Sequence, residues 1–246
     1  MTTIVTGGAG NLARVLRGMF PDFVYFSRSE MDVTKADNVA RSFSKYKPTT
    51  CIHLAANTDV ADCEKNHQMA YAVNTLGCRH VADACLQNST YLVYSSTDYV
   101  FDGEQGLYSE EDPPNPINYY GLSKLLGEFE VRRVPKHLIV RGTMKQDESW
   151  KHPKVPDDMY QSLLLYSQFA KILASLIQHQ VTGLVNVGYE RYNLFEFAKR
   201  RRPDIEPIKR ADITSVRLPR DCSLDVTKLR SIIDLDSILG LTNTQS

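Results

Sequence analysis

Tyr120 and Lys124 are the residues whose types and spacing most clearly suggest chemistry. They are four residues apart, so in a helix they lie on one face, one turn from each other. An ammonium in that position stabilises a phenolate and lowers the pKa of the tyrosine from its usual value of about 10. The pair could then transfer a proton near neutral pH. Because exposed helices also pair tyrosine and lysine by chance, the interpretation depends on the surrounding sequence.

A hydroxyl-rich stretch upstream supplies part of that context. Ser95, Ser96 and Thr97 follow the apolar run 91–94, which is typical of a buried parallel strand. Thr97 is therefore expected to place a hydroxyl at the carboxyl end of this strand. Taken alone, it could equally be a hydroxyl that stabilises a turn.

A glycine-rich turn follows the first predicted strand at Ile4 and Val5. In a dinucleotide-binding loop Gly7 would make the tight turn, Gly10 would let the backbone approach a pyrophosphate, and the small Ala13 would allow close helix packing. The helix that begins at Asn11 and Leu12 would supply an anion site at its N-terminus. A turn of this kind can also be purely structural.

The end of the next predicted strand, 23–26, bears on cofactor choice. A carboxylate there usually binds the ribose hydroxyls of NAD, but this chain has Ser27 and Arg28. A hydroxyl and a permanent cation favour the 2′-phosphate of NADPH, with NADH as the alternative. Asp32 is a further candidate contact, and Glu30 and Asp32 would weaken the field of Arg28.

Strands and helices alternate along the chain, which predicts an α/β fold with a doubly wound parallel (Rossmann-type) sheet and a small, mostly helical C-terminal part. A third strand is expected at 51–56; its last residues, Ala55 and Ala56, are candidate cofactor contacts, and His53 inside it is expected to be a core histidine. The remaining expected elements are a helix capped by Thr34, a long helix at 66–87, a helix from Asn118, strands at 137–141 and 183–187, and helices at 163–177, 194–201 and 226–233, the last capped by Asp225. Residues 144–158, around Trp150, are expected to form a surface or lid segment.

Composition excludes several classes of function. The chain has 246 residues, 42% of them apolar, and a formal net charge of zero, so no overall basic bias points to nucleic acid or acidic membranes. The basic run 199–202 is interpreted as the end of a helix. The five cysteines show no metal-ligand spacing and are expected to be reduced thiols. No signal peptide or membrane span is recognised, so a soluble, cytoplasmic protein is predicted.

Several phrases together resemble one known superfamily. Besides the glycine turn they are Ile52–Val60, Val73-Asn74, Ser95–Gly103, Asn118–Lys124 and Leu218–Asp225. They resemble the short-chain dehydrogenases/reductases, in particular the extended branch that acts on nucleotide sugars and, within it, the dTDP-4-dehydrorhamnose reductase family. The resemblance is strong over 1–141 and weak over 183–230, and residues 142–182 depart from the family pattern.

The resemblance implies a separate role for each of three residues. Tyr120 would protonate the carbonyl oxygen of the sugar as a hydride arrives from the nicotinamide, Lys124 would hold the nicotinamide ribose, and Thr97 would hydrogen-bond the carbonyl oxygen. It also implies a dinucleotide-binding part at 1–141, a variable loop and helix near the substrate at 142–182, a strand returning to the sheet at 183–190 and a small substrate-binding part at 191–246. A nucleotide sugar is the expected substrate, and a homodimer is compatible with the family.

Two other functions remain open at this point. A non-catalytic cofactor-binding protein, similar to the regulatory subunit of methionine adenosyltransferase, would share this fold, although it would not need the Thr97, Tyr120 and Lys124 set. A nucleotide-sugar epimerase would recycle its nicotinamide instead of consuming it. Dehydratases of the superfamily place an Asp-Glu pair where this chain has Asp98-Tyr99, so elimination lacks its second carboxylate.

Overall fold

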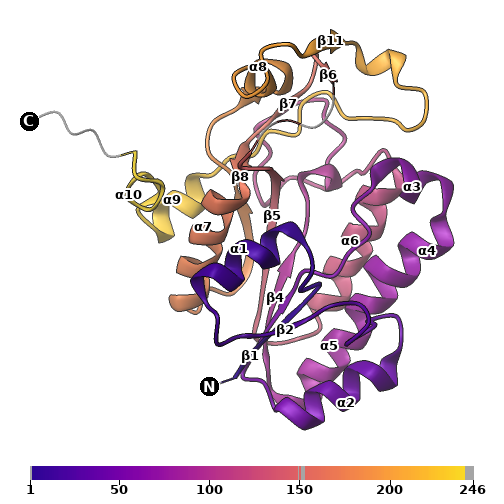
Figure 1. The fold of residues 1–246 in the computed structure, drawn as a ribbon, viewed down its shortest axis with the longest axis vertical. Coiled ribbons are helices and arrows are strands. Elements are labelled where there is room, and N and C mark those ends of the chain that lie inside the picture. Colours follow the sequence, from indigo (N-terminus) through magenta and orange to yellow (C-terminus); the bar gives the residue numbers. More distant parts are fainter. Residues whose placement is uncertain (1, 149, 151–152, 242–246) are drawn as a thin grey trace, which may run out of the picture.

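A parallel sheet forms the centre of the computed structural model, which describes residues 2–148, 150 and 153–241. The strand order is β2-β1-β3-β4-β5, with β9 and β8 both paired to β5. The strands are β1 (Thr3–Thr6), β2 (Val24–Phe26), β3 (Thr50–His53), β4 (Tyr91–Ser95), β5 (His137–Lys145), β8 (Leu163–Leu165) and β9 (Gly183–Val187). All these pairings are parallel. The predicted doubly wound Rossmann-type sheet is confirmed (Figure 1).

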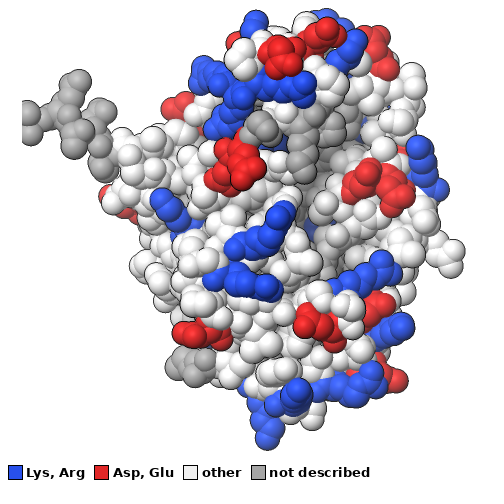
Figure 2. Space-filling model, viewed as in Figure 1, with Lys and Arg blue, Asp and Glu red and all other residues white. Residues whose placement is uncertain are grey.

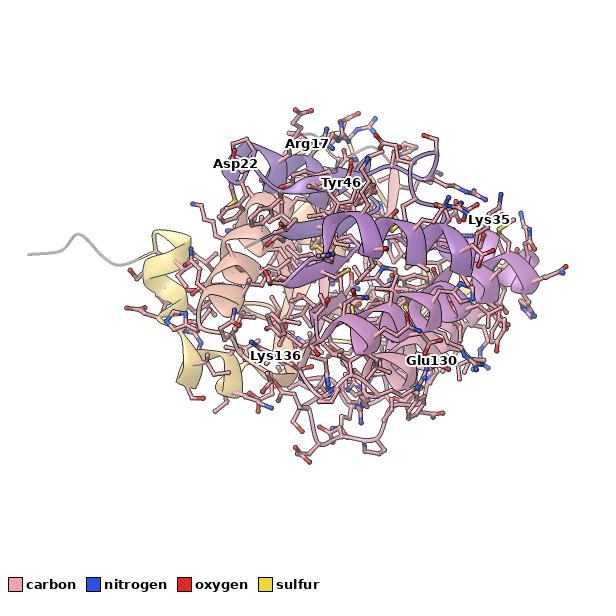
Figure 3. The ribbon with its side chains drawn as sticks, turned by 90° about the horizontal axis from the view of Figure 1, so that it is seen from below. Arg17, Asp22, Lys35, Tyr46, Glu130 and Lys136 are labelled. Atoms are coloured by element: carbon pink, nitrogen blue, oxygen red, sulfur yellow. The ribbon has the colours of Figure 1, made fainter. Side chains whose placement is uncertain are left out.

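Helices cover both faces of the sheet, as Figure 3 shows from below. One face packs under α2 (Ala36–Tyr46), α5 (Gly77–Asn88) and α6 (Tyr119–Val131), and the other under α1 (Asn11–Met19), α7 (Tyr166–Gln178), α9 (Thr227–Ile232) and α10 (Leu235–Leu239). Each face has its own apolar core, because strands buried on both sides need apolar side chains in both directions. Val39, Phe43 and Val81 belong to the first core, and Leu16, Ile172 and Leu229 to the second.

A smaller unit lies beyond the carboxyl ends of the strands, at the top of Figure 1. It contains β6 (Lys154–Pro156) paired with β11 (Glu206–Ile208), β7 (Tyr160–Gln161) paired with β10 (Tyr192–Asn193), and α8 (Leu194–Lys199). Its core is a separate cluster that includes Val155, Met159 and Phe197. This unit stands over the edge of the sheet where parallel α/β folds bind ligands.

The predicted long helix at 66–87 is present but interrupted. It consists of α4 (His67–Tyr71), a π-helical turn (Ala72–Leu76) and α5, and a short helix α3 (Val60–Lys65) that was not predicted precedes it. Single π-turns inside helices are frequent at functional sites. This one contains the buried Asn74, whose side-chain oxygen accepts from the amide of Asn57 at 2.8 Å.

Four local predictions were wrong. Thr34 does not cap α2, because its amide and hydroxyl both donate to Asp32, and Lys35 precedes the helix instead. The third strand is shorter than the predicted 51–56. β3 ends at His53, because its pairing with β1 ends there, and residues 54–56 lie outside the sheet. Residues 163–165 form a strand, β8, paired with the end of β5 and not the first turn of α7.

The fourth error concerns 144–158, which is not irregular throughout. Met144 and Lys145 complete β5, and Val155 lies in β6 with 2% of its surface exposed. Ser149, Lys151 and His152 lie outside the described residues. The final predicted helix begins at Thr227, after Val226, although the carboxylate of Asp225 does accept from the amide of Thr227.

Features expected to be structural have structural roles. All five cysteines are free and buried. The basic run follows α8, where Lys199 lies over the ring of Phe195 and Arg201 over that of Phe197. No helix in the described part of the chain is long and apolar enough to cross a membrane.

Candidate active site at the carboxyl end of the sheet

A cavity of about 820 Å³ opens at the carboxyl ends of the strands, beneath the small unit. Figure 2 shows this face hollowed near its centre, with acidic and basic residues on both sides of the hollow. Of the residues predicted from sequence, all except Ser27 line this one cavity: Gly7, Gly10, Asn11, Leu12, Arg28, Asp32, Ala55, Ala56, Thr97, Tyr120 and Lys124. The fold therefore brings together residues that are spread along the chain from Gly7 to Lys124.

The glycine turn forms one end of the cavity. Gly7 has a φ of +68°, and a Cβ there would come within 2.7 Å of the amide nitrogen of Ala55. Only glycine fits that conformation and that approach. The turn leads into α1, whose N-terminus carries no side-chain cap. Uncapped amides and the helix dipole make this end of the cavity suitable for an anion.

Arg28 and Asp32 line the cavity beside this end, and Ser27 does not. The Ser27 hydroxyl and amide donate to the carboxylate of Glu30 at 2.7 and 2.8 Å, which keeps that side chain occupied away from the cavity. The carboxylate of Asp32 accepts from Thr34, and these hydrogen bonds hold its pKa below the usual range. Arg28 makes no hydrogen bond to any described residue and is exposed, so its guanidinium is available to a ligand.

His53 ties the first and third strands together below the cavity. Its Nδ1 lies 2.7 Å from the hydroxyl of Thr6, which also accepts from the amides of Leu54 and Ala55 at 3.2 Å each. Burial lowers the pKa of His53 to about 3, so the ring is neutral. The prediction of a core histidine is confirmed, and its network fixes the backbone that leads to Ala55 on the cavity wall.

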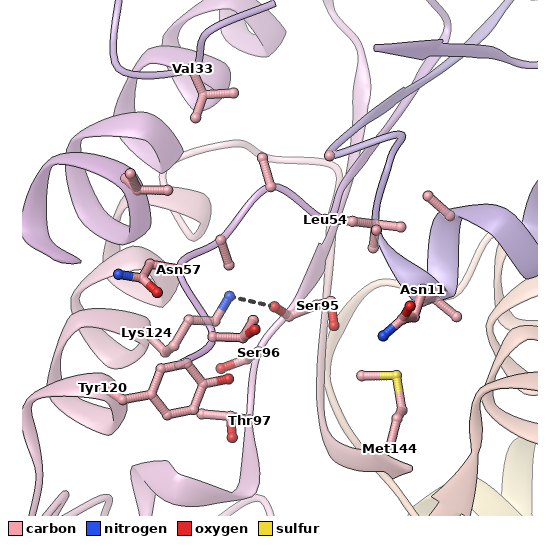
Figure 4. Close-up of a pocket in the computed structure, with 18 of the residues that line it drawn as sticks. Asn11, Val33, Leu54, Asn57, Ser95, Ser96, Thr97, Tyr120, Lys124 and Met144 are labelled. Carbon is pink, nitrogen blue, oxygen red and sulfur yellow. Dashed lines mark hydrogen bonds between the residues drawn. The ribbon is translucent and has the colours of Figure 1, made fainter. Parts of the chain in front are cut away.

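Helix α6 carries Tyr120 and Lys124 into the cavity. The side chain of Asn118 caps the helix by accepting from the amide of Gly121 at 2.9 Å, as such residues typically do. Gly121 packs so tightly that a Cβ would collide with the carbonyl oxygen of Tyr99. This contact sets α6 directly against the turn after β4 that carries Thr97. Figure 4 shows Tyr120, Lys124 and Thr97 converging on one side of the cavity, with Asn11 and Met144 across from them.

Lys124 is buried and held by the backbone of β4. Its Nζ donates to the carbonyl oxygen of Ser95 at 2.7 Å, drawn as a dashed line in Figure 4, and lies 4.2 Å from the centre of the Tyr94 ring. Burial lowers the pKa of Lys124 to about 8. The ammonium is thus fixed at the floor of the cavity.

Tyr120 behaves differently from the prediction. Burial raises its pKa above the usual value, the hydroxyl of Thr97 acts in the opposite direction, and Asp98 adds to the increase. The predicted lowering by Lys124 was wrong for this structure, because the ammonium interacts with Ser95 and the Tyr94 ring instead. Tyr120 is therefore a neutral phenol, the form that can donate a proton.

Two buried polar networks around the site were not predicted. The carboxylate of Asp98 accepts from Gln161 at 2.7 Å and from Thr97 at 3.2 Å, and burial raises its pKa to about 6. Glu128 of α6 accepts from Ser96 at 2.6 Å and forms a two-pronged ion pair with Arg141 of β5 at 2.9 and 2.7 Å. The sequence contains no spacing signal for contacts between residues so far apart.

Comparison with known proteins identifies the family. The family described as RmlD substrate binding domain matches residues 1–148. The chain belongs to this family. The match confirms the resemblance to the nucleotide-sugar branch, and it covers every candidate site residue.

The chain is also similar to individual curated proteins and to solved structures. A dTDP-4-dehydrorhamnose reductase of Aggregatibacter actinomycetemcomitans is 31% identical over 187 residues, which cover 73% of this chain and 61% of that protein. The chain thus spans less than two thirds of the length of such curated relatives. Among solved structures, a hypothetical dTDP-4-dehydrorhamnose reductase from Sulfolobus tokodaii is 30% identical, with a TM-score of 0.87 and 95% of each chain covered. The dTDP-4-dehydrorhamnose reductase of Bacillus anthracis in complex with NADP is 27% identical, with a TM-score of 0.87, 94% of this chain and 93% of that one covered.

Proposed function

We propose that this chain is an NADPH-dependent reductase of a nucleotide-linked 4-keto-6-deoxy sugar, with the dTDP-linked sugar named for its relatives as the first candidate substrate. The observation that carries the proposal is the convergence of Thr97, Tyr120 and Lys124 at one end of a single cavity whose other end is the Gly7 turn. The names of the relatives and the NADP complex of one neighbour support the same activity.

The cavity suits a dinucleotide at three points. The uncapped N-terminus of α1 and the Gly7 turn would hold the pyrophosphate. Arg28 would bind a 2′-phosphate, because it has no other hydrogen-bond partner among the described residues. Lys124 would hold the nicotinamide ribose by exchanging its bond to the Ser95 carbonyl for bonds to the ribose hydroxyls.

The protein's own part in the reaction is to position the sugar and supply a proton. When bound, NADPH supplies a hydride to the carbonyl carbon. Thr97 would donate a hydrogen bond to the carbonyl oxygen by giving up its bond to Asp98. The neutral phenol of Tyr120 would give its proton to that oxygen as negative charge develops there. Hydride and proton together convert the ketone into an alcohol. Partial exclusion of water by the half-buried site strengthens both interactions.

The small unit above the cavity is proposed to form the rest of the sugar site. Residues 142–182 and 191–246 supply β6, β7, β10, β11 and α8 beyond the carboxyl edge of the sheet. They also supply the end of β5, strand β8 and the helices α7, α9 and α10 that pack against the sheet, while 1–141 and 183–190 supply its other strands. Substrate contacts from this unit would complement those of Thr97 and Tyr120. A homodimer and a cytoplasmic location remain predictions.

A cofactor-turnover assay tests the proposal. Purified protein is mixed with NADPH and a panel of nucleotide 4-keto-6-deoxy sugars, and both NADPH and sugar are quantified. A reductase consumes one NADPH per sugar. Interconversion of sugars without net NADPH loss would indicate an epimerase, and NADPH binding without turnover of any sugar would indicate a regulatory protein.

A further inference from the structure

Lys145 is a cavity-lining cation that the proposed reaction does not use. It lies at the end of β5, is half-buried, and has no hydrogen-bond acceptor within the described residues. Among the residues that the structure describes, the ring it contacts is that of Trp150, whose centre is 5.6 Å from Nζ. An ammonium has three N–H donors, and leaving them unpaired in a partly buried site costs free energy. The side chain is therefore placed to receive acceptors from a ligand.

Asp98 balances the charge of Lys145. Burial lowers the pKa of Lys145, and Asp98 opposes that effect, while Lys145 in turn opposes the rise in the pKa of Asp98. The two groups form no direct ion pair in the described structure, and both line the cavity. The two oxygens of Asp98 already accept from Thr97 and Gln161. Each group therefore stabilises the charged form of the other while Lys145 keeps its donors free.

The position of this pair places it beside the reacting end of the cavity. Asp98 directly follows Thr97, and β5 reaches Lys145 through Gly142 and Thr143, which line the same wall. The features that suit the cofactor follow other strands: the Gly7 turn follows β1, and Arg28 follows β2. Lys145 thus borders the space left for the sugar.

We propose that Lys145 is a specificity-determining residue that binds the sugar ring of the substrate, donating hydrogen bonds to oxygen substituents near the reacting carbonyl. The inference rests on the proposed function. Because Asp98 already compensates the positive charge, the pair favours a neutral, hydroxylated sugar over a sugar acid. Trp150 holds the ammonium in place through its ring face.

Binding of the expected product tests the inference without requiring turnover. Calorimetric titrations measure the affinity of the full chain for dTDP-rhamnose, for dTDP and for NADPH. The variants are Lys145→Met, which keeps the length and removes the donors, Lys145→Arg, which keeps a cation, and Lys171→Met, an exposed lysine of α7 away from the cavity. Hydrogen bonds to a charged group predict about a ten- to hundredfold loss of dTDP-rhamnose affinity in Lys145→Met.

The pattern across ligands decides the outcome. The inference expects dTDP and NADPH affinities to stay unchanged in Lys145→Met, Lys145→Arg to regain part of the lost affinity, and Lys171→Met to match wild type. Equal weakening of dTDP and dTDP-rhamnose would assign Lys145 to the diphosphate and overturn the inference, as would unchanged binding of both. Wild-type protein that binds NADPH but neither dTDP compound would instead rule out the dTDP-linked substrate of the proposed function, and would overturn the inference with it.

Discussion

Tyr120 faces the cavity as a neutral phenol, because burial raises its pKa while Thr97 only partly offsets that effect. A proton donor must carry its proton when the substrate arrives, so a raised pKa suits reduction better than it would suit oxidation of an alcohol. Lys124, held by the carbonyl of Ser95, is close to the place where a cofactor ribose would lie. In the proposed reaction, Tyr120 donates the proton and Lys124 holds the cofactor, so two residues of one helix have separate roles.

Replacing Tyr120 by phenylalanine removes the proton donor and leaves the ring. We expect Tyr120→Phe to lose turnover by about a hundred- to ten-thousandfold, the usual contribution of one general acid. Steady-state assays measure turnover, and fluorescence titration with NADPH serves as the control, since cofactor affinity should not change. Near wild-type reduction by this variant would rule out Tyr120 as the acid.

Arg28 is the residue on which the proposed preference for NADPH rests. A charge-assisted contact to the 2′-phosphate contributes about 1.5 to 3 kcal/mol, or roughly ten- to a hundredfold in affinity. Arg28→Ala should therefore lower kcat/KM for NADPH by that factor and leave kcat/KM for NADH nearly unchanged. An unaltered ratio between the two cofactors would show that Arg28 does not contact the phosphate.

Helix α6 is the element on which the site depends most. It carries Tyr120 and Lys124, touches the turn after β4 through Gly121, and is joined to β4 and β5 through the buried network of Glu128. Breaking a buried ion pair such as Glu128–Arg141 typically costs about 3–5 kcal/mol. The position of the catalytic pair is therefore set by packing along the whole helix.

A pair of glycine substitutions tests that dependence. In Gly121→Ala the new methyl collides with the carbonyl of Tyr99, so we expect a stability loss of about 1–3 kcal/mol and a marked fall in kcat as Tyr120 shifts. Gly18→Ala in α1 is the matched control, because nothing lies within 4 Å of its added Cβ. It should gain up to about 1 kcal/mol from helix propensity and keep full activity. Thermal unfolding and assays of both variants provide the measurement; equal activity of the two would contradict a tight contact at Gly121.

Some elements and site residues could be predicted from the sequence, and others could not. Strands such as β4 and motif residues such as Gly7 and Tyr120 were predictable, because apolar runs and fixed spacings are local signals. The cap at Thr34 failed because Asp32 competed for the same hydroxyl. Residues 163–165 were assigned to the helix, since a short apolar run fits either structure until its pairing with β5 is known. Lys145 was missed because only the folded chain brings it to the cavity, and the Glu128–Arg141 pair was missed because only the folded chain brings these two residues together.

At the scale of the whole molecule, the cavity lies at the carboxyl edge of the sheet, and the small unit stands beyond that edge. In the proposed function, the dinucleotide lies at the end of the cavity formed by β1, α1 and the end of β2, and the sugar reacts at the end formed by β4, α6 and β5. The similarity to solved reductase structures extends over nearly the whole chain. In the curated relative from Aggregatibacter, the match covers 61% of that protein. We therefore expect this chain to contain every group that the proposed reduction requires.

The fate of the hydride tests that claim most directly. The chain is incubated with dTDP-4-dehydrorhamnose and NADPH deuterated on the transferring face of the nicotinamide, and the sugar product is analysed by mass spectrometry and NMR. The account predicts one deuterium per product molecule, bound to carbon 4, and none transferred by Tyr120→Phe on the same timescale. A product without deuterium at carbon 4, or no product from the wild-type chain, would contradict it.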